Sequence, residues 1–585
     1  MDKNELNQTK GMTNMVSKES SNKSRDVIES VFTIVGVIAF AFIVSLLCKK
    51  VMVTDVEPEL TIGTNNAETK LYNADYDGAI SAYEASKDKE EWPMYKVKEA
   101  EAYSLKGDYT YSNRLLSEAY DKRNELIRKE GIEKYREQDK ELGNLIVYTA
   151  LMNGDTKKAL EYGEIFFLDD GDNEKLNKTM FVVYLADGKT DEAKEILDAL
   201  NYDETSAKNL SQLAYMNIVI DNYEKAMEYL AKAYEVDKEE VSIYDVLEDV
   251  NIYHSEKLTD KLKSLCKKYE DEECYNVFLA KCYSLNGATA GEAQKILDKL
   301  SSSDLPNVPC KVMQADIYKN LGEIDKYNDE ITELIKSEKD NYYGEYVEAK
   351  YALENKNYSE GISYAKQSII DNRDYTNTYY EIMPQLLYAE KESEKAESYF
   401  RTALYKEPFN YNILISLANY CSDIQKDYEK ALKYYNLAIN MDKNNSEVYY
   451  NMAIAKSGLK KNDEAESFLN KAIELNKNEA KYYRKLANIY LLDKESDKAI
   501  KTIRKAYDIN KDDINTLNDA GYYYVSVGEI DRAVTNFKSA FEGLKDSTDV
   551  TVRDVITKNY DKVKEYSANK SLWTKSAIDD FKYLD

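Results

Sequence analysis

Residues 446–479 read SEVYYNMAIAKSGLKKNDEAESFLNKAIELNKNE, and the stretch that follows, 480–513, repeats the same pattern. An Asp-x-Ala triplet ends at Ala465, Ala499 and Ala533, so the spacing is the same both times. A second alanine follows seven positions after each of these three. Self-similarity at a fixed period of this size indicates a repeat array rather than a single globular core.

Within one unit the apolar residues recur at helical spacing. Met452 and Ala453 share one face of a first helix, and Ala465, Leu469 and Ala472 share one face of a second. The alanines permit two helix backbones to approach closely, where a larger side chain would overpack. We therefore predict helix pairs that bury their apolar faces by stacking on neighbouring pairs.

The period and the small-residue positions resemble the tetratricopeptide repeat, a helix-turn-helix unit of about 34 residues. The resemblance implies an all-α fold, a right-handed superhelical solenoid of antiparallel helix pairs, whose first helices line a concave groove. The second-helix position occupied by these alanines can be followed over 67–545, mostly in steps of 33 to 35 residues and not always as alanine, which predicts about 14 units, irregular near 241–270. A longer step predicts an extended helix over 112–129. Pro384 should kink or shorten a first helix.

The N-terminal region has a different composition. Residues 1–26 are polar and predict a disordered tail. Residues 27–47 carry a single charge, Glu29, and as a helix would span about 31 Å, the thickness of a bilayer core. We predict one transmembrane helix over 27–48, followed by a polar stalk over 49–66.

Two other interpretations of this apolar stretch stay open. A cleaved signal peptide usually has a shorter apolar region, of about 7 to 15 residues. A lipoprotein would use Cys48, although Leu47 is not the small residue that such processing requires. Basic residues are more numerous before the stretch than after it, which favours a cytoplasmic tail and an extracytoplasmic solenoid. These residues are Lys10, Lys18, Lys23 and Arg25 before it, and Lys49 and Lys50 after it.

The repeat pattern ends near residue 545. Apolar residues at helical spacing then predict two capping helices over 546–585, because the exposed end of a solenoid needs covering. A docking peptide formed by the last fifteen residues is the alternative.

Composition argues against catalysis. The chain has one histidine, and its six cysteines form no C-x-x-C pair, so neither a metal site nor histidine-based acid–base chemistry is expected. No glycine-rich phosphate loop is present. We predict no enzyme activity, no cofactor, no metal and no small-molecule substrate, although an active site within the irregular region 241–310 is a rival interpretation.

The formal net charge of −27 opposes nucleic-acid binding and is compatible with a neutral or basic protein partner. Tyrosine is abundant, at 53 residues. Low arginine together with high lysine, asparagine and tyrosine suggests a bacterial source with AT-rich DNA.

One set of residues is a candidate for binding a peptide. Tetratricopeptide proteins that grip the C-terminal carboxylates of heat-shock chaperones use Lys and Asn, then Asn, then Lys and Arg, from three successive first helices. Four of these places are matched in register, whereas Ile415 stands at the first lysine and a lysine replaces the arginine fork. Both asparagines are also consensus residues of the repeat, so a purely structural role is the alternative. The predicted groove contacts are Asn419, Asn451, Lys481, Lys485 and the second tyrosine of a pair, Tyr450.

Together these features predict a single-pass cell-membrane protein that presents a tetratricopeptide solenoid as a scaffold for protein or peptide partners. The position of the solenoid outside the cytoplasm favours assembly of an envelope or secretion complex. The alternative is a peptide-binding regulatory receptor of the tetratricopeptide type.

Overall fold

The computed structural model describes residues 60–87, 91–169, 171–300, 305–545, 548–569 and 575–584. The chain divides into two units, Met1–Thr61 and Ile62–Asp585. The predicted tail, the predicted transmembrane helix and most of the stalk lie outside the described residues. In the part of the chain that the structure describes, no helix combines the length and the apolar character needed to cross a membrane.

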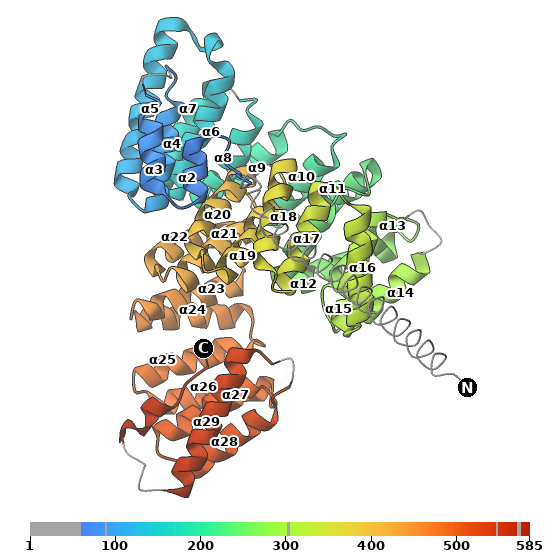
Figure 1. Ribbon diagram of the computed structural model, residues 1–585, viewed down its shortest axis with the longest axis vertical. Helices are drawn as coiled ribbons and strands as arrows, with labels where there is room; N and C mark the ends of the chain where they lie inside the picture. Colours follow the sequence, from blue (N-terminus) through green and yellow to red (C-terminus); the bar gives the residue numbers. More distant parts are fainter. Residues whose placement is uncertain are drawn as a thin grey trace, which may run out of the picture. The chain divides into compact units, whose positions relative to one another are not determined.

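The second unit is all-helical over its described residues, which confirms the predicted all-α class (Figure 1). The α-helices are α2 (Asn66–Tyr72), α3 (Tyr76–Glu84), α4 (Met94–Lys106), α5 (Tyr109–Glu130), α6 (Arg136–Met152), α7 (Thr156–Asp169), α8 (Glu174–Ala186), α9 (Thr190–Ala199), α10 (Ala207–Val219), α11 (Tyr223–Val236), α12 (Ser242–Lys268), α13 (Glu273–Ser284), α14 (Ala290–Leu300), α15 (Asn307–Leu321), α16 (Ile324–Ser337), α17 (Tyr342–Glu354), α18 (Tyr358–Asp371), α19 (Met383–Ala389), α20 (Ala396–Lys406), α21 (Tyr411–Asn419), α22 (Tyr428–Met441), α23 (Ser446–Gly458), α24 (Asn462–Leu475), α25 (Ala480–Leu492), α26 (Ser496–Ile509), α27 (Ile514–Ser526), α28 (Ile530–Glu542) and α29 (Val550–Ala568). Short 3₁₀-helices are η1 (Ile132–Lys134), η3 (Ser393–Lys395) and η6 (Lys575–Asp580), and π-helical turns are η2 (Thr378–Ile382) and η4 (Tyr420–Ile424).

Successive helices pack as pairs, such as α23 with α24 and α25 with α26. Ala465, Ala499 and Ala533 are fully buried, as their position between close helix backbones requires. The turn inside each helix pair needs one residue in the left-handed region. Between α27 and α28 this residue is Gly528, at φ 79°. The preceding turns place Lys494 and Lys460 there instead, at φ 63° and 60°.

The predicted irregular region is a kinked helix. Helix α12 runs without a turn through what would be both helices of a unit, and it bends at His254, whose φ is −130°. Nε2 of His254 lies 2.8 Å from a carboxylate oxygen of Asp442. A second irregularity precedes Pro384, where η2 widens the helix into a π-turn. Because proline has no N–H and crowds the carbonyl four residues earlier, a local change of hydrogen-bond pattern at this place is expected.

The solenoid also contacts itself far along the chain. Helices α20 to α22, named here the return segment, pack against much earlier helices, α20 against α2 and α22 against α8 (Figure 1). Oγ of Ser398 donates to the carbonyl of Leu71 at 2.7 Å. Nδ2 of Asn440 donates to the carbonyl of Ala186 at 3.0 Å. Stability therefore does not depend on sequence neighbours alone, as it would in an open array.

The C-terminal end differs from the predicted pair of capping helices. Helix α29 forms, but the second element within the described residues is the short 3₁₀-helix η6. Residues 581–584, named here the tail, are not helical. Their main-chain groups bond to side chains of other helices, and these contacts replace the hydrogen bonds of a helix.

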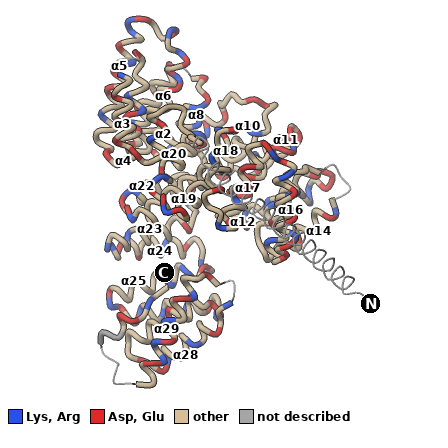
Figure 2. The backbone as a smooth tube through the Cα atoms, viewed as in Figure 1, with Lys and Arg blue, Asp and Glu red and all other residues tan. Residues whose placement is uncertain are grey.

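Charged residues are spread over the whole solenoid. Figure 2 shows Lys and Arg interspersed with Asp and Glu along nearly every helix, so the excess negative charge is not confined to one end.

Candidate functional site

The predicted groove residues lie on consecutive first helices. Asn419 ends α21, Tyr450 and Asn451 lie in α23, and Lys481 and Lys485 lie in α25. The structure brings the two asparagines together, because Nδ2 of Asn451 donates to Oδ1 of Asn419 at 3.1 Å. The hydroxyl of Tyr435 donates to the same Oδ1 at 2.6 Å.

The lysines and the tyrosine also have neighbours within the fold. Nζ of Lys481 lies 2.8 Å from a carboxylate oxygen of Glu447 and 5.3 Å from the ring centroid of Tyr450. The Tyr450 ring packs on Tyr482, with centroids 5.2 Å apart. Lys485 follows Lys481 by about one helical turn and is buried. These five residues form part of the first-helix surface, and their role in peptide binding stays a prediction.

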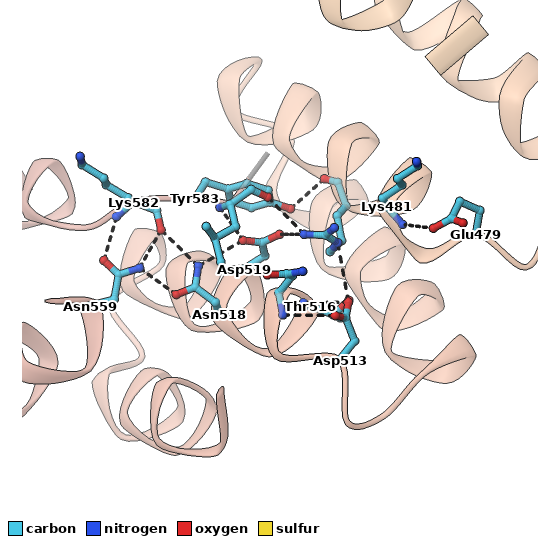
Figure 3. A network of polar contacts seen from close by, with 12 residues as sticks. Glu479, Lys481, Asp513, Thr516, Asn518, Asp519, Asn559, Lys582 and Tyr583 are labelled. Carbon is cyan, nitrogen blue, oxygen red and sulfur yellow. Dashed lines mark hydrogen bonds and ion pairs between the residues drawn. The ribbon is translucent and has the colours of Figure 1, made fainter. Parts of the chain in front are cut away.

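The tail lies across the next part of the same surface (Figure 3). The amide of Leu584 donates to Oδ1 of Asp519 at 2.8 Å, and Nη1 of Arg484 donates to the carbonyl of Leu584 at 3.3 Å. The hydroxyl of Tyr583 donates to the carbonyl of Arg484 at 2.8 Å. Residues of α25 and α27 therefore hold the main chain at the end of the tail.

Two asparagines hold the main chain of Lys582 (Figure 3). The amide of Lys582 donates to Oδ1 of Asn559 at 3.0 Å, and Nδ2 of Asn559 donates back to the carbonyl of Lys582 at 2.7 Å. Nδ2 of Asn518 reaches the same carbonyl at 3.3 Å. An asparagine amide offers both a donor and an acceptor, so it can pair with a peptide group as a neighbouring strand would.

Aromatic contacts fix the rest of the tail. The ring of Phe581 stacks on Phe537 with centroids 5.6 Å apart, and its residue is 4 % exposed. The ring of Tyr583 meets Tyr522 edge to face at 5.5 Å. Aromatic anchors of this kind dominate many peptide interfaces.

The charges under the tail are deeply buried. Asp519 is fully buried, and its carboxylate lies 3.4 Å from Nη1 of Arg484. Burial opposes the charge on Arg484, but the carboxylates of Asp519 and Asp513 outweigh it and raise the pKa of the guanidinium. A buried pair of this kind needs further hydrogen bonds to be favourable, and the tail supplies two of them.

Sequence reasoning did not single out Arg484, Asn518, Asp519 or Asn559. Arg484 directly precedes Lys485, and Asn518 and Asp519 occupy the equivalent places one repeat later. The period of the repeat could have marked Asn518 and Asp519 as groove residues. Asn559 lies beyond the regular repeats and has no such signal.

The first-helix surface of the N-terminal half is occupied by the chain itself. The return segment and the loop before α21 contact five successive first helices, α4, α6, α8, α10 and α12. The hydrogen bonds, one for each first helix, are Arg401 to Ser104 (3.2 Å), Tyr148 to the Arg401 carbonyl (2.6 Å), Asn440 to the Ala186 carbonyl (3.0 Å), Tyr215 to Asn410 (3.1 Å) and Asn412 to the Asp249 carbonyl (2.8 Å).

Within the described residues, no group of three His, Cys, Asp or Glu side chains is placed to hold a metal ion. The five cysteines in these ranges are free thiols, and burial raises the pKa of Cys282 to about 12.

Comparison with known proteins agrees with the repeat geometry. Residues 424–489 and 480–513 each match a model of the tetratricopeptide repeat, so the predicted repeats are confirmed there. The search of curated proteins found no match.

Several solved structures also match the chain, each with a low TM-score. The Cut9–Hcn1 hetero-tetramer of the APC/C is 16% identical, covers 84% of this chain and 95% of its own, and has a TM-score of 0.40. Yeast Tom70 is 15% identical over 86% of this chain and 96% of its own, with a TM-score of 0.32. The pilF protein of Pseudomonas aeruginosa is 16% identical over 39% of this chain and 96% of its own, with a TM-score of 0.30.

Proposed function

We propose that this chain is an interaction scaffold that binds an extended segment of a protein partner on the first-helix surface of α23 to α27. The observation that supports this proposal most directly is the tail. Arg484, Asn518 and Asp519 already bind the main chain of an extended segment there. Main-chain recognition with aromatic anchors is a general mode of peptide binding.

We further propose that residues 27–47 anchor the scaffold in the cell membrane, with the solenoid outside the cytoplasm, where it helps to assemble an envelope or secretion complex. This proposal is based on the apolar length of the stretch and on the distribution of basic residues around it. Protease added to intact protoplasts tests the orientation. Digestion of residues 67–585 is expected, while a cytosolic control survives; survival of the solenoid would place it inside.

The occupied state of the surface also favours a second candidate function, a peptide-responsive receptor. An incoming peptide must displace the tail before it can contact Arg484 and Asp519. Binding would then release residues 581–584 from the solenoid, and this release would be the signal.

A peptide copy of the tail tests the binding surface. We would measure fluorescence anisotropy of labelled IDDFKYL, residues 578–584, with the full chain. Tyr583→Ala loosens the internal tail, so the peptide should bind this variant about tenfold more tightly than the unaltered chain. When Asn518→Ala is added to the Tyr583→Ala chain, the affinity for the peptide should fall again.

The matched control is Asn478→Ala, which removes an exposed asparagine outside this surface and should leave affinity within about twofold. Absence of any binding to the Tyr583→Ala chain, with its fold intact by circular dichroism, would rule out this surface as a peptide site.

A further inference from the structure

A second concave site lies beside Asn419. A cavity of about 360 Å³ opens between the first half of α12, the segment η2–α19 and the segment α21–η4. Both π-helical turns of the described chain contribute to its wall, η2 through Tyr380 and Glu381, and η4 through Tyr420 and Asp423. Such turns are rare and occur frequently at functional sites.

The wall of this cavity, named here the acidic cavity, is rich in carboxyl groups. Its lining residues include five carboxylates and no Lys, Arg or His. Two lysines that line an adjoining cavity form ion pairs with two of these carboxylates. Lys281 lies 2.7 Å from Glu248, and Lys350 lies 3.4 Å from Glu381. The five carboxylates are Asp245, Glu248, Asp249, Glu381 and Asp423.

Asp245 is a partly buried carboxylate of this wall. Its side chain has neither an ion pair nor a hydrogen bond within the described residues, and it also lines two adjoining cavities. Burial, followed by the charges of Glu248 and Asp249, raises its pKa well above the ordinary value. A cation placed beside it would favour the ionised form and offset this cost.

Asn412 offers a further acceptor in the same wall. Its residue is 3 % exposed, and Nδ2 donates to the carbonyl of Asp249 at 2.8 Å. Its Oδ1 has no hydrogen-bond partner in the described structure. A buried acceptor without a partner is unfavourable, and a ligand that donates hydrogen bonds would satisfy it.

The remaining wall is aromatic, and the rim is apolar. Tyr388 and Tyr420 stack nearly parallel, with centroids 6.0 Å apart. Ile252 and Ile424 are 60% and 42% exposed at the mouth. Aromatic faces attract cations, and an exposed apolar rim suits the aliphatic stem of a long basic side chain. The aromatic lining residues are Tyr253, Tyr380, Tyr388, Phe400 and Tyr420.

We propose that the acidic cavity binds the guanidinium or ammonium group of an Arg or Lys side chain presented by the protein partner. The carboxylates provide charge complementarity, the aromatic rings contact the cation, and Ile252 and Ile424 contact its stem. The formal net charge of −27 favours the approach of a basic partner. This proposal rests on the scaffold function and names the chemistry of the partner.

Matched peptides test the proposal with the full chain in detergent micelles. The probe is a labelled Gly-Ala-Arg-Ala-Arg-Ala-Gly peptide, and its partner has both arginines replaced by citrulline, which keeps the shape and removes the charge. We expect the arginine peptide to bind at least about tenfold more tightly, a difference of about 1.4 kcal/mol. Equal affinity of the two peptides would overturn the proposal.

Asp245→Asn removes a carboxylate without breaking an internal contact, so the fold should be retained. We expect about fivefold weaker binding of the arginine peptide, and a larger loss when Asp423→Asn is added. Asp512→Asn, an exposed change outside the cavity, is the matched control and should change affinity less than twofold. An Asp245→Asn chain that binds as tightly as the unaltered chain would also overturn the proposal.

Two further binding measurements complete the test. One distinguishes a free amine from a partner side chain as the source of the cation, and the other distinguishes the acidic cavity from the surface that holds the tail. Free cadaverine carries the same ammonium chemistry, and binding as tight as that of the arginine peptide would contradict a partner side chain as the occupant. The IDDFKYL peptide reports on the other surface. If that peptide binds and the arginine peptide does not, only the cavity proposal fails, whereas failure of both peptides removes the scaffold proposal as well.

Discussion

At the scale of single residues, Lys433 in the return segment has an unusual environment. Its Nζ lies 3.6 Å from the ring centroid of Tyr109 and has no hydrogen-bond partner in the described structure. Burial, followed by the charges of Arg401 and Lys430, lowers its pKa to about 7 from 10.5. This site therefore disfavours the charged lysine, and the aromatic face and the charge of Glu397 offset only part of the cost.

This environment predicts a specific pH dependence. Between about pH 7 and 10.5 the unfolded chain binds more protons at this lysine than the folded chain does, so its contribution to the free energy of unfolding rises with pH. Lys433→Met should remove a slope of up to about 1.4 kcal/mol per pH unit and stabilise the chain at pH 7. Urea unfolding at several pH values measures the difference between variant and unaltered chain, with the exposed Lys443→Met as control. Parallel pH profiles would contradict the assignment.

A buried ion pair gives a second residue-scale prediction. Arg123 is 3 % exposed and contacts Asp139 at 2.5 Å and Asp169 at 2.7 Å. Asp139 is buried, whereas the side chain of Asp169 is 38% exposed. Asp139→Asn should therefore cost about 3 kcal/mol, because it leaves a buried guanidinium without its main partner. Asp169→Asn should cost less than about 1 kcal/mol. Denaturation midpoints compare the two, and equal losses would show that burial does not decide the effect.

Only part of the candidate site could be predicted from residue patterns in the sequence. The period placed Asn419, Asn451 and Lys481 on one surface, because groove positions recur with the repeat. The carboxylates around Asn419 could not be found in this way. Asp245 and Asp249 come from α12, much earlier in the chain, and they line the same cavity as Asn419 only because the solenoid contacts itself. That contact depends on the pitch of the superhelix, which no local pattern encodes.

At the scale of helices, the repeat period predicted helix positions best where the spacing between units is constant. Helices α23 to α28 follow the constant spacing of the repeat, and their alanines are buried as expected. The π-turn η2 has a visible cause in Pro384, whereas η4 contains no proline and had no signal in the sequence. The tail was predicted as a helix because Phe581 and Leu584 fit helical spacing, but competing main-chain hydrogen bonds prevent one.

A close contact between two helices gives a prediction at this scale. Ala499 of α26 is fully buried where α26 packs on α25. Ala499→Leu should therefore overpack this contact and lower the free energy of unfolding by about 1–3 kcal/mol. Hydrogen exchange should rise first in α25 to α28. Lys501→Leu places the same side chain on the exposed face of α26 and should change stability by less than about 0.5 kcal/mol. A comparable rise of exchange over residues 67–160 would contradict coupling between neighbours.

At the scale of the whole chain, the return segment makes stability non-local. Arg401 is 1 % exposed, its Nη1 donates to Ser104, and its carbonyl accepts from the hydroxyl of Tyr148. These contacts join α20 to α4 and α6, which lie many repeats earlier in the chain. In an open solenoid a change in α20 would affect only α19 and α21 and their neighbours.

The last prediction tests this connection. Arg401→Ala removes the side-chain hydrogen bond to Ser104 and the packing of the guanidinium on the Tyr148 ring, whose centroid is 5.5 Å away. Hydrogen exchange should therefore rise in α4 and α6 as well as in α20, although α11 and α14, which lie between them in sequence, should change little. Arg504→Ala on the exposed face of α26 is the matched control and should leave all of these helices unchanged. If exchange rose only in α19 to α21, coupling would follow sequence neighbours alone, and the return segment would not stabilise the N-terminal helices.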